Sequence, residues 1–425
     1  MISRVKGTQD FLNLKLYNFV IDLIKNHLEN YNFKEIQTPI LEHIELFQRS
    51  VGEHTDIVNK EMFTFTTKGD EILCLRPENT ASIVRAFLNS QTSPKTTLGN
   101  QTQIDVPWKV FTVGPMFRYE RPQKGRYRQF HQVSIEIIGS DSVSQDAQFI
   151  KMLDQLFKDK ICINNYSLLV NYLGTTEDRK KYTELVKNFL EQNSTKICEK
   201  CKERAEKNTL RIFDCKNPDC IELYKSAPKI TDNLSADTKG EWEKLKEALD
   251  ILDVKYVIAP HLVRGLDYYN KTVFEFVSLE LGAQNAFCAG GRYDQLALMI
   301  GGKKDEPSIG AAIGIERLLD LVELVKGKLQ IPEEKYLTVV LPLSKEQNES
   351  ALLLADTLLQ NNIRTEVLFD DSSLKSKMRK ANKLSAKYVL LIGEEEQKNN
   401  NVTVKNMASG NEETINQTKV TDYIQ

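Results

Sequence analysis

Polar and apolar side chains alternate most clearly along residues 128–139, and this alternation predicts a β-strand. Gln132, Ser134 and Glu136 fall on one face of the strand. The residues of the opposite face are all apolar: Val133, Ile135 and Ile137. Because a buried polar group costs free energy unless it has a partner, the polar face suits a ligand site better than plain packing.

A preceding strand is predicted to start at Val110 and to end in Phe117–Glu120, and it is followed by a basic loop at 121–127. Arg118 lies at the end of this preceding strand and offers a permanently charged, planar group suited to phosphate or carboxylate. The basic loop also suits phosphates, although charged loops are often simply solvated. The hairpin therefore predicts a site for a polar small molecule beside a phosphate.

The segments around this hairpin mix helix and strand patterns, which favours an α+β fold for the first part of the chain. Apolar residues recur at helical spacing along 12–31, and a strand that includes Thr38–Leu41 carries Pro39. Proline cannot donate a ladder hydrogen bond, so we expect this strand at an edge or an interface. A hairpin is predicted over 61–75 and a helix over 81–88.

Residues 174–255 differ from the rest, since they are rich in Lys and Glu and mostly helical in pattern. Strand-like segments lie on both sides of them, which predicts a domain inserted into the first one. Strands resume at 273–277, and a strand over 308–314 leads into a helix over 315–325. The predicted organisation is a first domain in two parts, 1–173 and 256–328, an insertion at 174–255 and a last domain at 329–425.

The last domain alternates strand and helix patterns in the order β-α-β-α-β, which predicts a parallel sheet covered by helices. The predicted elements are a strand at 337–341, a helix to about 360, a strand at 364–369, a helix at 374–384 and a strand at 388–392. The asparagines at 399–401 are expected to form a loop. The helix at 374–384 is basic, a pattern that is more often solvated than bound to a ligand.

The composition is that of an ordinary globular protein, with 41% hydrophobic and 27% charged residues. A net charge of -2 over 425 residues gives no global attraction to nucleic acid, so any such contact needs a local basic patch. We find no leader pattern and no apolar run of membrane-spanning length, and therefore expect a cytoplasmic protein without membrane contact. Seven cysteines, an odd number, fit a reducing compartment.

Four of the cysteines lie in the predicted insertion, as Cys198-x2-Cys201 and Cys215-x4-Cys220. Two interpretations stay open for them: a tetrahedral zinc–thiolate site, or reduced thiols buried in a helical domain. The remaining cysteines lie in apolar strand contexts and are expected in the core: Cys74, Cys162 and Cys288. We assign no metal ligand to the predicted ligand site.

Several motifs occur in the order found in class II aminoacyl-tRNA synthetases. The segments that resemble the three class motifs are Thr38-Pro39-Ile40, then Phe117–Glu120 with Arg128–Gln132, then Gly314–Leu318. Two further segments resemble those that distinguish the histidyl-tRNA synthetase family: Leu262–Tyr269 and Gly290–Asp294. Gly7–Asp10 and Leu75–Glu78 fit the same family. The resemblance covers the whole chain, and motifs in register are far more specific than any one alone.

The resemblance implies a fold, a reaction and partners. The fold is the class II antiparallel sheet with flanking helices, a helical insertion and a C-terminal α/β anticodon-binding domain. In the reaction, histidine and ATP give histidyl-adenylate and pyrophosphate, and the histidyl group then passes to the 3′ end of tRNA(His). ATP is thus a substrate, with Mg2+ on its phosphates. The family also implies a homodimer, with the strand around Pro39 at its interface.

The resemblance further implies roles for single residues. Arg118 would bind the α-phosphate, Arg126 and Arg317 the rest of ATP, and Arg264 would act as a catalytic electrophile from the opposite side. Fixed cations suit this step because charge builds on the phosphorus oxygens. The expected histidine-binding residues are Glu78, Asn79, Thr80, Gln132, Glu136, Tyr268, Tyr269 and Tyr293. Taken alone, each arginine is more often a surface ion pair and a tyrosine pair is as often core.

Two rival hypotheses stay open. A non-catalytic, histidine-sensing paralogue of the kind that accompanies ATP phosphoribosyltransferase would keep the fold, but would lack the last domain and lose the catalytic arginines. A zinc-dependent nucleic-acid-binding protein would instead depend on the cysteine segment. The chain departs from the family at Asn79, where glycine is usual, which raises the question of the backbone angle there.

Overall fold

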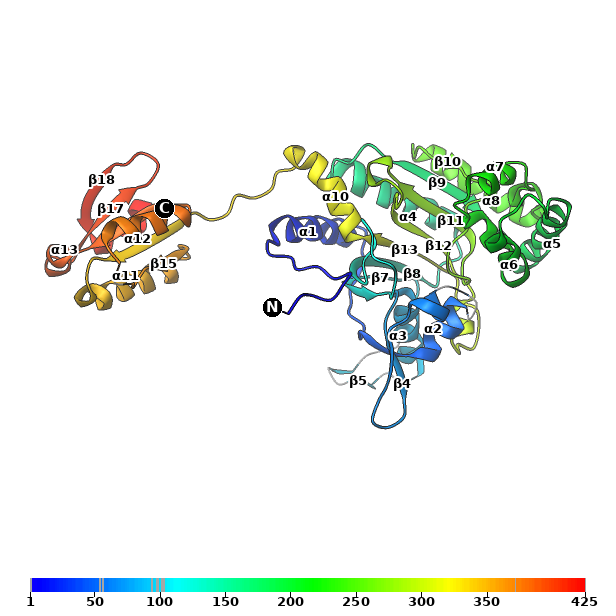
Figure 1. Cartoon of the computed structure of the whole chain (residues 1–425), viewed down its shortest axis with the longest axis horizontal. Helices are drawn as coiled ribbons and strands as arrows, with labels where there is room; N and C mark the ends of the chain where they lie inside the picture. The colour runs from blue at the N-terminus through cyan, green and yellow to red at the C-terminus, as the bar shows by residue number, and fades with distance from the viewer. Residues whose placement is uncertain are drawn as a thin grey trace. The chain divides into compact units, whose positions relative to one another are not determined.

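The computed structural model describes residues 2–424 except 53, 54, 56, 93, 94, 97, 98, 101–103 and 371. The chain forms two compact units, Met1–Ile331 and Pro332–Gln425 (Figure 1). The division falls close to the predicted boundary between 328 and 329. Among the described residues, no helix is long and apolar enough to cross a membrane.

An eight-stranded sheet organises the first unit, in the order β1-β7-β8-β13-β12-β11-β9-β10. The strands are β1 (Lys34–Glu35), β7 (Trp108–Phe117), β8 (Gln129–Ile138), β9 (Ser167–Tyr172), β10 (Val257–Ile258), β11 (Asn270–Val277), β12 (Ala286–Arg292) and β13 (Ser308–Gly314). The central strands pair antiparallel, whereas β1 and β10 add parallel edges. The predicted antiparallel sheet is therefore confirmed, with parallel edge strands that the sequence did not indicate.

Helices bury the apolar face of this sheet. They are α1 (Lys15–Asn30), α4 (Val143–Gln155), α8 (Ala236–Ile251) and α10 (Ile315–Val325). Val133, Ile135 and Ile137 of β8 lie in one core with residues of all four helices. Because side chains alternate along a strand, this burial turns the polar residues of β8 to the other side, toward α3 (Thr80–Thr92) (Figure 1).

The segment after α1 forms less strand than predicted. Pairing in β1 stops at Glu35, and the next strand, β2 (Leu41–His43), starts only after Pro39. The predicted strand through Thr38–Leu41 is therefore wrong in extent, since proline supplies no N–H to a ladder. β2 instead joins the predicted hairpin, which is confirmed, in a small sheet of order β2-β4-β3. The remaining elements here are β3 (Thr64–Thr66), β4 (Ile72–Leu75) and α2 (Ile44–Val51).

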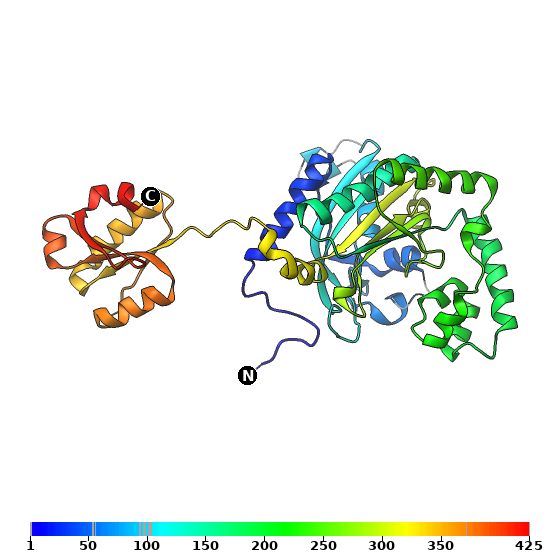
Figure 2. The ribbon, with the colours of Figure 1, turned by 90° about the horizontal axis from the view of Figure 1, so that it is seen from above.

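The segment 174–255 is mostly helical, as predicted. Its elements are α5 (Thr176–Gln192), α6 (Glu199–Lys207), the 3-10 helix η3 (Thr209–Asp214), α7 (Pro218–Tyr224) and α8. Figure 2 shows these helices gathered at one edge of the first unit. β9 and β10, the strands on either side of the segment, pair with each other. The boundaries of a separate insertion domain stay a prediction.

The second unit is built on a sheet of order β15-β14-β16-β17-β18. Its elements are β14 (Leu337–Pro342), α11 (Asn348–Gln360), β15 (Thr365–Val367), α12 (Leu374–Lys383), β16 (Ala386–Ile392), α13 (Glu394–Lys398), β17 (Asn401–Asn406), β18 (Glu412–Asn416) and α14 (Val420–Ile424). The predicted β-α-β-α-β run is confirmed, while the antiparallel β17–β18 hairpin was missed. Lys377 of the basic helix α12 is buried and donates to the Pro342 carbonyl at 2.6 Å, so this lysine is not solvated.

Candidate functional site

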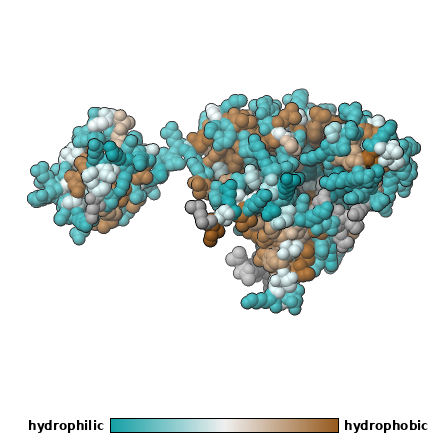
Figure 3. Space-filling model, in the orientation of Figure 1, coloured by the Kyte–Doolittle hydropathy of each residue, from teal (hydrophilic) through white to brown (hydrophobic). Residues whose placement is uncertain are grey.

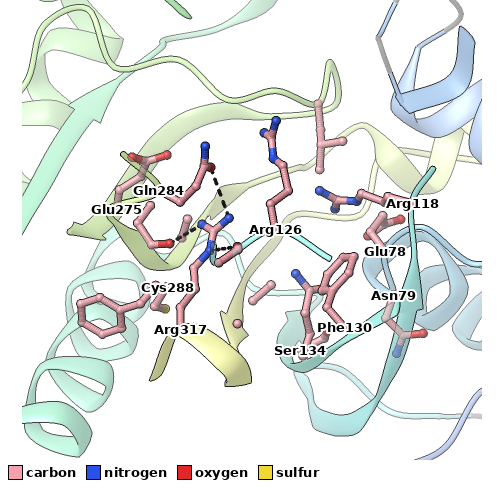
Figure 4. Close-up of a pocket in the computed structure, with 18 of the residues that line it drawn as sticks. Glu78, Asn79, Arg118, Arg126, Phe130, Ser134, Glu275, Gln284, Cys288 and Arg317 are labelled. Carbon is pink, nitrogen blue, oxygen red and sulfur yellow. Dashed lines mark hydrogen bonds between the residues drawn. The ribbon is translucent and has the colours of Figure 1, made fainter. Parts of the chain in front are cut away.

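A cavity of about 280 Å³ opens on the polar face of β8, near the lower end of the size range of small-ligand sites. Its walls come from the residues before α3, the β7–β8 hairpin, the loop 264–269, and strands β12 and β13 (Figure 4). Arg118, Arg264 and Arg317 are far apart in sequence, yet all three line this one cavity. The fold thus brings together the three cations on which the predicted site depends.

Arg317 is fixed by three contacts at the start of α10. Its Nε donates to the Gly125 carbonyl at 2.9 Å, its Nη1 to the Ala286 carbonyl at 2.6 Å and its Nη2 to Gln284 at 3.4 Å (Figure 4). Burial lowers the pKa of Arg317, and the positive charges of Arg126 and Arg118 lower it further. Cations that repel one another in a polar cavity form a ready site for an anion such as phosphate.

Arg118 and Arg126 approach from the β7–β8 hairpin. Arg118 donates from Nε to the Pro77 carbonyl at 2.9 Å, and its guanidinium lies 5.3 Å from the centre of the Phe130 ring. Arg126 forms an ion pair with Glu120. These contacts orient both guanidinium groups toward the cavity (Figure 4), where their planar donors can meet phosphate oxygens.

Arg264 is held by a carboxylate that the sequence did not single out. Its Nη1 pairs with Glu275 of β11, and its guanidinium lies 5.5 Å from the centre of the Tyr269 ring. Burial is the largest single influence on the pKa of Arg264 and lowers it, but Glu275, Tyr269 and Tyr268 together outweigh burial and keep that pKa above its usual range. Within the described residues, Arg264 Nε is buried without a hydrogen-bond partner. The sequence offered one signal for Glu275, namely that it is the single carboxylate in the otherwise apolar run 273–277.

Glu136 is completely buried at the base of the polar face. Its carboxylate accepts from the Thr80 hydroxyl at 2.7 Å and from the Tyr293 hydroxyl at 2.5 Å. Burial raises the pKa of Glu136 to about 8, against the lowering effect of these two hydrogen bonds, and the charge of Glu78 raises it further. Neither Glu136 nor Tyr293 lines the cavity itself; Glu136 lies behind the cavity wall and contacts it through Thr80, which does line it. A raised pKa beside a cavity is typical of functional carboxylates.

Glu78 lies at the start of α3 and is buried as well. Its carboxylate accepts from the N–H groups of Thr80 at 2.6 Å and Ala81 at 2.9 Å. Burial raises its pKa, while these hydrogen bonds and the charge of Arg118 lower it. An ionised carboxylate has about four acceptor positions, so Glu78 can still accept from an amino group in the cavity.

Asn79 turns out to belong to a structural network. Its Oδ1 accepts from the Thr38 hydroxyl at 2.9 Å and from Arg76 at 3.0 Å. Arg76, for which no role was predicted, is buried and also donates to the carbonyls of Thr38 and Pro115. Asn79 is not among the described residues with positive φ, so the departure from glycine needs no unusual backbone angle. Although Asn79 lines the cavity, its amide oxygen is already engaged.

Aromatic rings and unpaired polar atoms complete the wall. The ring centres of Tyr268 and Tyr269 lie 4.7 Å apart, and both residues line the cavity. Gln132 Oε1 and Ser134 Oγ are buried and have no hydrogen-bond partner in the described part of the chain. Since buried polar atoms are nearly always paired, a polar ligand is the natural partner for this face.

His131 points away from the cavity, as the alternation of β8 predicted. Its Nδ1 lies 2.9 Å from Glu316 Oε1, and Glu316 also accepts from the His131 N–H. The ring packs edge-on against Phe11 and Tyr17. His131 therefore fixes Glu316 next to Arg317, which supports the site without placing a base in it.

The antiparallel sheet, with motif arginines and carboxylates gathered over its polar face, defines a class II aminoacyl-tRNA synthetase. The family described as histidyl-tRNA synthetase matches residues 21–318, and the family described as anticodon binding domain matches residues 338–425. The chain therefore belongs to the histidyl-tRNA synthetase family.

Similar proteins span nearly the whole chain. A histidine–tRNA ligase of Thermodesulfovibrio yellowstonii is 43% identical over 96% of this chain and 95% of its own length. A histidine–tRNA ligase of Clostridioides difficile is 40% identical, with 96% of each chain covered. The structure of apo histidyl-tRNA synthetase from S. aureus matches with a TM-score of 0.79 and 33% identity, over 100% of this chain and 99% of that one. The predicted enzyme, an ATP-dependent histidine–tRNA ligase, is confirmed over the regulatory paralogue.

Proposed function

We propose that this chain activates histidine with ATP inside the cavity and then transfers the histidyl group to tRNA(His). The observation that carries the proposal is the convergence of Arg118, Arg264 and Arg317 on a cavity that also contains buried carboxylates. The cations suit the phosphates of ATP. The acidic and aromatic part suits an amino acid with an imidazole side chain. The two substrates would thus meet on the polar face of β8.

Histidine would lie between the tyrosines and the buried carboxylates. Glu136 would accept from a ring nitrogen and so fix the tautomer of the imidazole, with its own orientation set by Thr80 and Tyr293. Glu78 would accept from the α-amino group. Gln132 would bond the amino acid's polar end with the amide oxygen that has no partner in the described structure. A site of this kind rejects analogues that leave its polar groups unpaired.

In the first step a carboxylate oxygen of histidine attacks the α-phosphorus of ATP. A new oxygen–phosphorus bond forms as the bond to pyrophosphate breaks, and negative charge builds on the oxygens between. Arg118 and Arg264 would stabilise that charge, while Arg126 and Arg317 would hold the distal phosphates. Because Glu275 and Tyr269 fix Arg264 beforehand, its charge needs little reorganisation during the reaction.

Mg2+ would enter with the ATP phosphates. It is a hard cation that takes oxygen ligands and is commonly held by one or two carboxylates together with substrate phosphates. Two cavity-lining carboxylates offer such oxygens, Glu120 and Glu275, and the ion would share them with Arg126 and Arg264, which already pair with them. The ion would neutralise part of the pyrophosphate charge.

The partners follow from the units. The second unit would bind the anticodon of tRNA(His), and the basic loop 121–127 would bind the acceptor end of the same tRNA.

We also propose a cytoplasmic homodimer. Apolar side chains stay exposed near the β2–β4 sheet (Figure 3), namely Ile40, Leu41, Phe65 and Ile72. Several exposed apolar side chains in one region suit a subunit interface, and light scattering of the purified chain would give its mass in solution.

An ATP–pyrophosphate exchange assay tests the proposal. Each of the twenty amino acids is supplied in turn with ATP, Mg2+ and labelled pyrophosphate. We expect exchange with histidine alone, because adenylate formation is reversible and the pocket selects imidazole. Exchange with another amino acid, or with none from a chain that binds both substrates, would contradict the proposal.

A further inference from the structure

The insertion contains a compact cluster of four thiols. The Sγ atoms of Cys198, Cys201, Cys215 and Cys220 all lie within 4.8 Å of one another. The Sγ atoms of Cys198 and Cys215 are 3.8 Å apart. Four sulfurs placed about 2.3 Å from a central zinc ion in a tetrahedron would be about 3.8 Å apart. A disulfide would need about 2.05 Å, and all these cysteines are free.

We propose that these four cysteines bind one zinc ion in a closed, structural site. The donor set contains sulfur only, which favours zinc over the hard cations Mg2+ and Ca2+. Four protein ligands fill a tetrahedron, so no position is left for a substrate or a reactive water. The site is therefore separate from the synthetase cavity in both place and chemistry.

Backbone groups around the cluster support thiolate ligands. The Cys198 N–H donates to Cys220 Sγ at 3.3 Å, and the Asn217 N–H donates to Cys215 Sγ at 3.4 Å. The first contact joins the pair at the start of α6, Cys198 and Cys201, to the pair at α7. Hydrogen bonds of this kind orient metal ligands and stabilise their charge.

The cluster also lies within a hydrophobic core that the insertion shares with the rest of the first unit. Cys201 and Cys220 are fully buried and share that core with Tyr182, Ile212 and Tyr224. The helices joined here are short, since α6 spans Glu199–Lys207 and α7 spans Pro218–Tyr224. Small domains with short helices commonly need a metal or a disulfide for stability.

The segment between the two cysteine pairs contacts the loop that carries Arg264. Asn208 donates from Nδ2 to Asp267 Oδ1 at 2.9 Å, and Arg211 donates from Nη2 to the Gly265 carbonyl at 3.0 Å. Both partners lie next to Arg264 or Tyr268 in the chain. The zinc ion would thus hold the segment that positions this loop. This last link rests on the proposed function, whereas the metal site does not.

Metal analysis of the full-length chain tests the site. The chain is purified without chelators and without a metal-binding tag, and its metals are measured by mass spectrometry. We expect one zinc per chain, lost in Cys215→Ser and Cys220→Ser and retained in the matched control Cys162→Ser, which alters a cysteine outside the cluster. Cobalt in place of zinc should give the intense sulfur-to-cobalt absorption of a tetrahedral thiolate site.

A second measurement uses the unaltered chain, so the test does not depend on whether the cysteine variants fold. The chain is titrated with a mercurial reagent, and the released zinc is detected with a zinc indicator. One zinc should be released as the four thiols of the cluster react. A chain that contains no zinc and takes up neither zinc nor cobalt would overturn the proposal, as would stoichiometric iron. Zinc that persists in Cys220→Ser but disappears from Cys162→Ser would overturn it too.

The link to the loop has its own test. Asn208→Ala should keep its zinc and lower kcat for adenylate formation severalfold, with little change in the affinity for ATP. An unchanged kcat would overturn the positioning role alone. Zinc content and pyrophosphate exchange are measured separately, so loss of the zinc site and failure of the proposed ligase reaction are distinguishable.

Discussion

Gly310 lies directly opposite Glu136 in the β8–β13 ladder, and its lack of a side chain leaves room for the carboxylate. A Cβ atom at position 310 would lie 1.5 Å from Glu136 Oε2. Glu136 could not keep its hydrogen bonds to Thr80 and Tyr293 against such an atom. The proposed histidine pocket would thus depend on a residue that contacts no substrate.

Gly310→Ala should therefore weaken histidine binding by at least tenfold while the chain still folds. The added methyl displaces the Glu136 side chain, and overpacking of this kind costs about 1–3 kcal/mol of stability. Calorimetric titration with histidine and a thermal melt check both parts. The matched control is Gly240→Ala in α8, where a Cβ would meet nothing within 4 Å. Unchanged histidine affinity in Gly310→Ala would show that Glu136 does not need its present position.

The pH dependence of stability should reveal the buried Glu136. Burial raises its pKa from 4.5 to about 8, so the folded chain binds more protons than the unfolded chain between these values. Stability from this group is thus complete below about pH 4.5 and is lost as the pH rises toward about 8. Glu136→Gln removes that loss. The Tm advantage of this variant over the unaltered, ligand-free chain should therefore grow from about pH 5 to about pH 8.

The same variant should lose affinity for histidine, because the proposed contact with the imidazole would favour the ionised form of Glu136, and an amide has no ionised form. Thermal melts at the two pH values and calorimetric titration are the measurements. A Tm difference that does not change with pH would mean that Glu136 titrates near its ordinary value.

Arg264→Ala should slow adenylate formation by about 10²–10³-fold, in line with the loss of one transition-state donor. The dissociation constant of histidine should change little, because Arg264 is expected to act on the phosphate. Glu275→Gln should slow adenylate formation less, because this change loosens the Arg264 side chain but leaves the arginine and its charge in place. Single-turnover adenylate formation measures both, with the exposed Arg4→Ala as the control. A normal rate in Arg264→Ala would exclude the electrophile role.

Arg317→Ala should raise the KM for ATP by about tenfold or more and leave histidine affinity unchanged, because a charged phosphate contact is lost. Arg317→Lys should recover only part of the affinity. A lysine cannot reproduce three separate contacts, to Gly125, Gln284 and Ala286, with one ammonium group. Steady-state pyrophosphate exchange at varied ATP measures this, and equal ATP affinity in all three proteins would refute the assignment.

Local patterns allowed much of the fold to be predicted. The two-residue alternation of β8 indicated both the core face and the cavity face, because strand geometry alone determines which side chains share a face. The β17–β18 hairpin escaped prediction although Val402 and Val404 alternate with polar residues, because only two apolar positions carry that pattern and Asn401, the first residue of β17, was expected in a loop. The helix α12 showed a basic pattern, but burial of Lys377 depends on the Pro342 carbonyl from a distant strand.

The site was predicted to the extent that each residue lies within a recognisable motif. Arg118, Arg264 and Arg317 meet in one cavity as expected. Asn79 lines the same cavity, but its amide oxygen is engaged by Arg76 and Thr38, and its Nδ2 alone is buried without a partner among the described residues, so its role toward histidine stays a prediction. No local pattern in the sequence specifies such a contact. Glu275 and Gly310 were missed for the same reason, since their importance comes from neighbours brought close only by folding.

A structure of the chain with histidine and a non-hydrolysable ATP analogue would test the central claim most directly. We predict the imidazole beside Glu136, the α-phosphate between Arg118 and Arg264, and the distal phosphates at Arg317. A nucleotide bound elsewhere, or phosphates that none of these three guanidinium groups contacts, would contradict the account.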